Sequence, residues 1–412
     1  MGPEAPRHAY FVPGRIEVLG KHTDYAGGRT MVAVAERGFC LAASPRQDRR
    51  IRVCDAACGD TVEFNLDPEL VPRAGHWSNY PMTVARRVAR NFPGIERGAD
   101  IALASDLPPA AGMSSSSAMM VATWLALAEV NALEDRPEFR ENIMDLTDLA
   151  GYLGTVENGQ TFGSLVGDRG VGTFGGSEDH TAILNARPGH VSQYSYCPVR
   201  FERLLPVPSG YTFAIGSSGV AAEKTGSAME KYNRASRLLS KITELWREAT
   251  GCDDRYLAAA LASGPEAVGR LTQIVQHARP GEMDPKALLT RLEHFLTENE
   301  QILPAAGDAL ARGDLARFGE LVDRSQLASE QLLGNQVPET VYLALSARSA
   351  GAVAASAFGA GFGGSVWALI EAAAADAFLD KWIQAYREQF PEQARAAVFF
   401  TTAAGPAAFR VT

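Results

Sequence analysis

The chain has 412 residues, and a typical domain length of about 150 residues suggests two or three domains. A hydrophobic fraction of 46% and a charged fraction of 21% exclude intrinsic disorder, and a formal net charge of −9 repels nucleic-acid backbones and anionic lipids. We therefore expect no nucleic acid and no membrane as partners, and five scattered cysteines without a secretory signal predict a reduced, cytoplasmic protein.

The first half of the chain mixes short β-rich segments with helices. Residues 99–107 alternate in apolar character, which predicts a strand, and the apolar run 117–133 predicts a buried helix directly after it. A second, amphipathic helix is expected over 141–158. Residues 212–218 predict a strand that opens a second unit.

The second half is helical from about 221 to 349 and ends in a β-loop-β-α-β pattern. The helical part is interrupted at Gly251, Gly264, Pro280 to Gly281, Gly313 and Pro338. A proline-containing stretch at 204–209 suggests the boundary between an N-terminal domain, 1–205, and a C-terminal domain, 206–412. The expected architecture is α+β in two domains.

A glycine- and serine-rich loop, LPPAAGMSSSSA at 107–118, links the predicted strand to the buried helix. Small residues let the backbone approach an anion closely, and the N-terminus of the following helix directs free N–H groups and a positive dipole end at it. Serine hydroxyls can bind phosphate or ligate Mg²⁺. The stretch lacks the Walker A pattern, and a serine-rich cap on a core helix is the alternative interpretation.

Three segments together resemble the GHMP kinases, and the first of them resembles galactokinases in particular. They are GRIEVLGKHTDYAGG at 14–28, the loop at 107–118, and FGAGFGGS at 358–365. The resemblance implies a two-domain GHMP kinase fold, with an N-terminal domain like ribosomal protein S5 domain 2 and a ferredoxin-like C-terminal domain. It also implies ATP and Mg²⁺ as cofactors and direct phosphoryl transfer to a hydroxyl of a sugar.

The resemblance assigns the ATP-binding residues to the loop and its surroundings. By similarity these are Trp77, Pro109, Gly112, Met113, Ser114, Ser115, Ser116, Ser117 and Gly361. Ser116 and Glu157 match the residues that hold Mg²⁺, a hydroxyl and a carboxylate that suit a hard cation. An exposed helix acid is the alternative for Glu157, and a core aromatic is the alternative for Trp77.

Asp179 matches the catalytic aspartate of the family, and Arg15 matches the arginine beside it. The aspartate would accept the proton of the acceptor hydroxyl, and the arginine would keep it ionised. A purely structural Arg–Asp pair is the alternative. The sugar would be bound by Lys21, His22, Asp24, Gly175, Gly176 and Tyr232. An apparent insertion near 163–172 and His180 receive no role.

Two residues of the first segment depart from the galactokinase pattern. Glu17 replaces the usual asparagine, and Lys21 replaces a glutamate that faces the sugar near its C6 hydroxyl. Lysine only donates hydrogen bonds and is cationic, which suggests a uronic acid whose C6 carboxylate Lys21 would bind. The alternative is that Lys21 pairs with Glu17 or Glu178 and never meets the substrate.

Three functions therefore remain open on the sequence. The first is a sugar 1-kinase acting on galactose or a close relative, as a monomer or homodimer. The second is a kinase for a uronic acid or another modified sugar. The third is a non-catalytic sensor of sugar and ATP, which the presence of Arg15, Ser116 and Asp179 disfavours.

Overall fold

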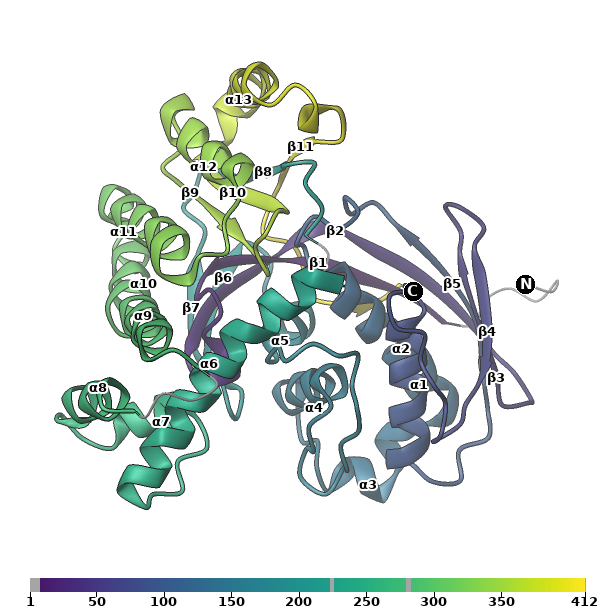
Figure 1. The fold of residues 1–412 in the computed structure, drawn as a ribbon. Helices are drawn as coiled ribbons and strands as arrows, with labels where there is room; N and C mark the ends of the chain where they lie inside the picture. The colour runs from purple at the N-terminus through teal and green to yellow at the C-terminus, as the bar shows by residue number, and fades with distance from the viewer. Residues whose placement is uncertain (1–7, 223–225, 279–282, 412) are drawn as a thin grey trace.

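The computed structural model describes residues 8–222, 226–278 and 283–411, which form two β-sheets with helices packed around them (Figure 1). In these residues eight strands make one sheet and four make the other. The largest of the buried hydrophobic clusters continues from the first sheet to the second, because it contains Val12 and Leu41 as well as Phe213 and Trp367. The observed architecture is α+β, as predicted.

The larger sheet has the strand order β12-β1-β2-β5-β3-β4, with β6 paired to β2 and β7 paired to β6. Its strands are β1 (His8–Leu19), β2 (Arg29–Pro45), β3 (Arg50–Asp55), β4 (Thr61–Asn65), β5 (Ala99–Ser105), β6 (His190–Ser195), β7 (Arg200–Pro206) and β12 (Phe409–Arg410). All neighbours are antiparallel except β3 and β5. The long β2 pairs with β1 and β5, and its first residues pair with β6.

Five helices accompany this sheet, and α1, α2 and α4 lie together on one side of it in Figure 1. They are α1 (Asn79–Asn91), α2 (Ser115–Asn131), α3 (Pro137–Arg140), α4 (Leu146–Asn158) and α5 (Glu178–Asn185). The helix α2 contacts β1 and β2, and eleven of its side chains are buried, including Trp124 and Leu127. Burial on this scale explains why the segment is apolar on all sides.

The smaller sheet has the strand order β11-β8-β10-β9, and most of the helices of the second half lie in sequence between its first strand, β8, and its second, β9. The helices are α6 (Gly226–Thr250), α7 (Leu257–Ala262), α8 (Ala267–Gln276), α9 (Pro285–Leu296), α10 (Leu303–Ala311), α11 (Leu315–Ala328), α12 (Pro338–Ala350) and α13 (Ala375–Gln389). The strands are β8 (Tyr211–Ser217), β9 (Ala354–Phe358), β10 (Ser365–Glu371) and β11 (Val398–Thr402). Short π-helical segments, Thr297–Ile302 and Ser329–Leu333, lie between α9 and α10 and after α11.

Most predicted elements are confirmed, and one boundary is wrong. The strand at 99–107, the helix at 117–133 and the C-terminal β-loop-β-α-β pattern correspond to β5, α2 and β9–β10–α13–β11. The helix predicted from residue 141 starts at Leu146, because the Asp145 side chain caps it by accepting from the N–H groups of Thr147 and Asp148. The predicted break at Pro280 to Gly281 lies outside the described residues.

The chain leaves the larger sheet after β7 and enters the smaller one at β8, close to the predicted boundary at 205/206. It does not stay there. The strand β12 returns to the larger sheet and pairs with β1 through Tyr10 and Phe11. The division into two domains by sequence position therefore stays a prediction.

Candidate active site

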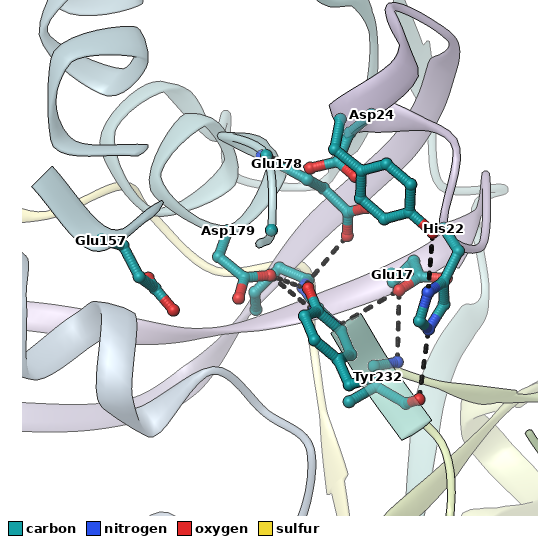
Figure 2. Close-up of a pocket in the computed structure, with 13 residues that line it drawn as sticks. Glu17, His22, Asp24, Glu157, Glu178, Asp179 and Tyr232 are labelled. Atoms are coloured by element: carbon teal, nitrogen blue, oxygen red, sulfur yellow. Dashed lines mark hydrogen bonds and ion pairs between the residues drawn. The ribbon is translucent and has the colours of Figure 1, made fainter. Parts of the chain in front are cut away.

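Two cavities meet at Arg15, and both are lined by segments that the sequence singled out. The inner cavity is lined by Arg15, Glu17, His22, Asp24, Tyr25, Glu157, Gly175, Gly176, Glu178, Asp179, Tyr232, Gly359 and Ala360 (Figure 2). The serine-loop pocket is lined by Arg15, Phe39, Gly75, His76, Trp77, Asn79, Tyr80, Ala110, Gly112, Ser114, Ser115, Ser116, Met119, Ala222 and Ala360. Arg15 and Ala360 are common to both.

The loop between β5 and α2 forms the wall of the serine-loop pocket. Gly112 has φ +73°, and a Cβ there would lie 3.2 Å from the carbonyl oxygen of Phe358. Ser114 also adopts a left-handed conformation (φ 58°), and α2 begins at the next residue, so the free N–H groups of its first turn lie beside the pocket. This arrangement is typical of a phosphate-binding helix N-terminus.

The remaining predicted ATP residues lie around this loop. Trp77 lines the pocket and donates from Nε1 to Asp60 Oδ2 at 2.6 Å. Met113 is buried, and its carbonyl accepts from the backbone N–H of Arg15 at 3.0 Å. Pro109 and Gly361 are not among the lining residues.

Arg15 and Asp179 are in direct contact, as expected from the two motifs. The Nε and Nη2 atoms of Arg15 lie 2.7 and 2.5 Å from Asp179 Oδ1. Arg15 lies on β1, and Asp179 lies in the first turn of α5, 164 residues further along. Burial lowers the pKa of Arg15, but the carboxylates of Asp179, Glu178 and Glu17 outweigh it, so that the guanidinium remains charged.

The other oxygen of Asp179 is joined to Glu157 through Ser117. The Ser117 hydroxyl lies 2.9 Å from Glu157 Oε2 and 3.2 Å from Asp179 Oδ2, and it donates to one or shares its proton between them. His180 Nε2 is 3.5 Å from the same Glu157 oxygen. Glu157 is buried at the end of α4, so the alternative of an exposed helix acid is wrong.

The turn that follows β1 brings His22 and Asp24 to the inner cavity. His22 Nε2 lies 3.1 Å from the Ala360 carbonyl, and Nδ1 lies 3.1 Å from the Tyr25 hydroxyl. Asp24 Oδ2 accepts from the backbone N–H of Glu178 at 3.2 Å. A Cβ at Gly176 would lie 2.3 Å from that oxygen, so only glycine allows this approach.

Gly175 and Tyr232 complete the set of predicted sugar residues in the cavity. A Cβ at Gly175 would lie 2.8 Å from the Tyr232 hydroxyl, and the Tyr232 ring lies 5.2 Å from the His22 ring. The turn after β1, the segment before α5 and the helix α6 therefore bring together His22, Asp24, Gly175, Gly176 and Tyr232.

Lys21 is placed elsewhere, and neither sequence interpretation describes its surroundings. Its Nζ donates to the hydroxyls of Ser325 and Ser356 at 3.1 and 2.5 Å, and it is not among the residues that line the inner cavity. Glu298 accepts from Ser325 at 3.0 Å and from the backbone N–H of Gly20 at 2.7 Å. We call Lys21, Glu298, Ser325 and Ser356 the Lys21 group.

Burial lowers the pKa of Lys21, while the negative charge of Glu298, Glu17 and Glu330 opposes this shift. No ion pair within 4.0 Å joins Lys21 to Glu17 or Glu178 among the described residues. The expectation that Lys21 faces the acceptor sugar is therefore not supported by this structure.

Sequence reasoning named Glu17 and Glu178 only as possible partners of Lys21 and did not place either carboxylate in the inner cavity, which both of them line. Glu17 Oε2 accepts from the N–H of Gly359 at 3.2 Å and lies 3.7 Å from Arg15 Nη1. Glu178 Oε1 lies 3.2 Å from Arg15 Nε. Both could have been found: Glu17 is two residues from Arg15 on one strand and so shares its face, and Glu178 directly precedes Asp179.

Among the described residues, no group of three or more His, Cys, Asp or Glu side chains is arranged to hold a metal ion without further ligands. Within the same residues, no helix combines the length and the apolar character that a membrane crossing requires.

Three family models match the chain. The "GHMP kinases N terminal domain" matches residues 79–163, the "Galactokinase galactose-binding signature" matches residues 1–45, and "GHMP kinases C terminal" matches residues 308–388. The matched ranges contain β1 with its turn and the serine loop with α2, and the third range runs from within α10 to the end of α13 but for its last residue.

Individual relatives agree with these models. The galactokinase of Chloroflexus aggregans is 30% identical over 381 residues, which cover 91% of this chain and 86% of the relative. The galactokinase of Actinobacillus pleuropneumoniae serotype 5b is 27% identical over 365 residues, covering 87% of this chain and 84% of the relative.

Solved structures show the same fold. A galactose complex of Lactococcus lactis galactokinase superposes with a TM-score of 0.79 at 24% identity, covering 98% of this chain and 95% of that one. Methanococcus jannaschii mevalonate kinase gives 0.56 at 12% identity, covering 98% and 100%. The first similarity extends over nearly the whole chain. The chain belongs to the galactokinase family of the GHMP kinases and is an ATP-dependent sugar kinase of the galactokinase type.

Proposed function

We propose that this protein transfers the γ-phosphoryl group of ATP to the C1 hydroxyl of galactose or a closely related sugar. The observation that carries this proposal is the position of Arg15, which lines both cavities and contacts Asp179. One guanidinium thus connects a pocket suited to phosphates with a cavity suited to a sugar. Such an arrangement favours phosphoryl transfer over binding alone.

Asp179 would act as the general base. In the reaction the acceptor oxygen forms a bond to the γ-phosphorus as the bond to the β–γ bridging oxygen breaks, and ADP leaves. The hydroxyl proton passes to Asp179, whose Oδ2 lies beside the Ser117 hydroxyl while Arg15 holds Oδ1. Arg15 would also stabilise negative charge on the transferring group.

Sugar hydroxyls would be bound by the turn after β1. Asp24 is an acceptor with two oxygens, one of which already accepts from a backbone N–H, and it lines the same cavity as Tyr232 and His22. A carboxylate in this position can accept from vicinal hydroxyls. The backbone at Gly175 and Gly176 would let the sugar ring approach closely.

Mg²⁺ would be held by Ser116 and Glu157 together with the ATP phosphates. Proteins commonly bind this ion through one or two oxygen ligands and the phosphates of the substrate, which agrees with the lack of a larger ligand cluster in the described residues. Ser116 lines the serine-loop pocket and Glu157 lines the inner cavity, so the two residues flank the boundary between them. The ion would neutralise phosphate charge during transfer.

The uronic-acid alternative receives no support from the geometry. It requires a cation facing the sugar, but the Lys21 ammonium donates to Ser325 and Ser356. A carboxylate on the acceptor would instead face the carboxylates of Glu17 and Glu178, and like charges repel at short distance.

The test is ADP release with MgATP and a panel of free sugars: galactose, glucose, arabinose, fucose, galacturonate and glucuronate. Turnover of galactose or another neutral hexose, with a 1-phosphate identified by phosphorus NMR, is the expected result. Turnover of a uronate alone would contradict the assignment of the acceptor. ATP binding without turnover of any sugar would contradict the proposed reaction.

A further inference from the structure

Acidic side chains far outnumber basic ones in the lining of the inner cavity. Among the described residues that line it, five carboxylates face one guanidinium: Glu17, Asp24, Glu157, Glu178 and Asp179 against Arg15. Figure 2 shows Glu17, Glu178 and Asp179 converging from β1 and α5. Arg15 lies within 4.0 Å of these three and cannot neutralise them all.

Glu17 has an oxygen without a partner. The side chain is only 3% exposed, and its Oε2 accepts from the N–H of Gly359. Its Oε1 is buried and has no hydrogen-bond partner among the described residues. An unsatisfied buried oxygen of this kind costs free energy unless a ligand supplies a donor.

Glu178 adds a second oxygen of the same kind. It is 5% exposed, and its Oε1 has an ion-pair distance of 3.2 Å to Arg15 but accepts no hydrogen bond from the described residues. Arg15 Nε is directed at Asp179 Oδ1 instead. Both glutamates therefore have acceptor capacity that the protein leaves unused.

The electrostatic setting agrees with this geometry. Burial is the largest cause that raises the pKa of Glu17 to about 7; Asp179 acts in the same direction, and Arg15 and Lys21 only partly oppose the shift. Burial and the charge of Glu17 raise the pKa of Glu178 well above its ordinary value. A cation in the cavity would restore the ionised form of both carboxylates, whereas an anion would make ionisation still more costly.

Resting on the proposed sugar kinase activity, we propose that the preferred acceptor is a cationic amino hexose whose protonated amine is bound by Glu17 and Glu178. An ammonium group supplies up to three donors and one positive charge, and the two glutamates offer two unused acceptors and the excess negative charge. A neutral hexose supplies hydrogen-bond donors but no positive charge. A uronic acid also supplies hydroxyl donors, but its carboxylate adds negative charge to the cavity.

The first experiment compares ligands on the unaltered protein. It measures kcat/KM with MgATP for galactose, 2-amino-2-deoxygalactose, 6-amino-6-deoxygalactose, N-acetylgalactosamine and galacturonate. At least one amino hexose should exceed galactose by about tenfold or more, as expected for a charge-assisted hydrogen bond. N-acetylation, which removes the charge, should abolish a preference for the 2-amino sugar.

Failure of the inference and failure of the proposed function give different results. If galactose matches or exceeds every amino hexose, the inference is wrong and the sugar kinase assignment stands. If no sugar is phosphorylated although ATP binds, the proposed function is wrong. Calorimetric binding of the same sugars without ATP then decides the inference, which again requires that an amino hexose binds more tightly than galactose.

The second experiment removes the charge from the protein. Glu17→Gln keeps the shape of the side chain, and it should lower the ratio of amino-hexose to galactose kcat/KM by about tenfold. Glu298→Gln is the matched control, because Glu298 is also buried but does not line the cavity, and it should leave the ratio unchanged. A ratio that responds equally in both variants, or in neither, would overturn the assignment of Glu17.

Discussion

Glu17 and Glu178 beside Arg15 are buried, and so is the Lys21 group, but of the two sets only Glu17 and Glu178 are among the residues that line the inner cavity. In the Lys21 group, Nζ has two hydroxyl acceptors, and Glu298 Oε1 accepts from Gly20 and Ser325. Around Arg15, Glu17 and Glu178 keep oxygens without hydrogen-bond donors among the described residues. One group joins the turn after β1 to α11 and β9, and the other is arranged for a ligand.

This difference shows that two departures from one sequence motif can have different roles, one in the ligand cavity and the other in packing. Glu17 and Lys21 both depart from the galactokinase pattern, and their charges lie four residues apart in sequence. Satisfaction of polar atoms, rather than position in the motif, separates a structural residue from a ligand-binding one. Glu298 Oε2 is the one exception within the Lys21 group, since it is buried without a hydrogen-bond partner among the described residues.

The largest effect of a substitution is expected among the carboxylates around Arg15, on the rate of phosphoryl transfer. Asp179→Asn removes the proposed base while preserving the side-chain shape, and kcat should fall by about 10²–10⁴-fold. Steady-state ADP release with the preferred sugar measures this loss. Asp48→Asn, which removes a partly exposed carboxylate paired with Arg46, is the control and should retain activity. A full rate in Asp179→Asn would assign the base elsewhere.

On the structural side, Lys21→Met should destabilise the fold by about 3 kcal/mol, because it removes a buried ammonium that donates to the hydroxyls of Ser325 and Ser356. The denaturant midpoint reports this loss. The control is Lys241→Met, which breaks an exposed pair with Glu244 and should cost at most about 1 kcal/mol. If Lys21→Met instead leaves stability intact and raises the KM for the sugar, Lys21 binds substrate and the contrast fails.

The pH dependence of stability sharpens the comparison at Glu17. Its pKa is about 7 in the folded protein against 4.5 as the ordinary value. The folded state therefore binds the proton of Glu17 more tightly than the unfolded state does, and proton binding stabilises the fold at low pH. This contribution to the free energy of unfolding is lost as pH rises from about 4.5 to about 7. Glu17→Gln should remove up to about 3 kcal/mol of that loss. Urea unfolding of the ligand-free protein between pH 4 and pH 8 measures it, and an unchanged slope would contradict the assignment.

The smallest effect concerns the other pocket. Trp77→Ala removes an aromatic wall of the serine-loop pocket and should raise the KM for ATP by roughly two- to tenfold, the range expected for one aromatic contact. The KM for the sugar should stay the same, because Trp77 does not line the inner cavity. Trp77→Phe keeps a ring and should recover most of the affinity. Equal changes in both KM values would mean that the two cavities are not separate.

Local sequence patterns predicted the parts of the molecule that are decided locally. The alternation in 99–107 and the apolar run 117–133 are properties of single segments, and the matched motifs placed Arg15 beside Asp179. The surroundings of Lys21 could not be predicted this way. Its hydroxyl partners follow it by 304 and 335 residues, in elements whose packing no local pattern reports.

The edge of the larger sheet has a consequence for how the chain is made. The strand β1 carries Arg15 and Glu17, and near its start Tyr10 and Phe11 pair with Arg410 and Phe409 of β12. A ribosome completes β1 long before it reaches those residues, so the edge stays open through most of synthesis. Open edges are sites of mispairing between chains. Nascent chains of this protein are therefore expected to need protection at this part of the edge until residues 409 and 410 emerge.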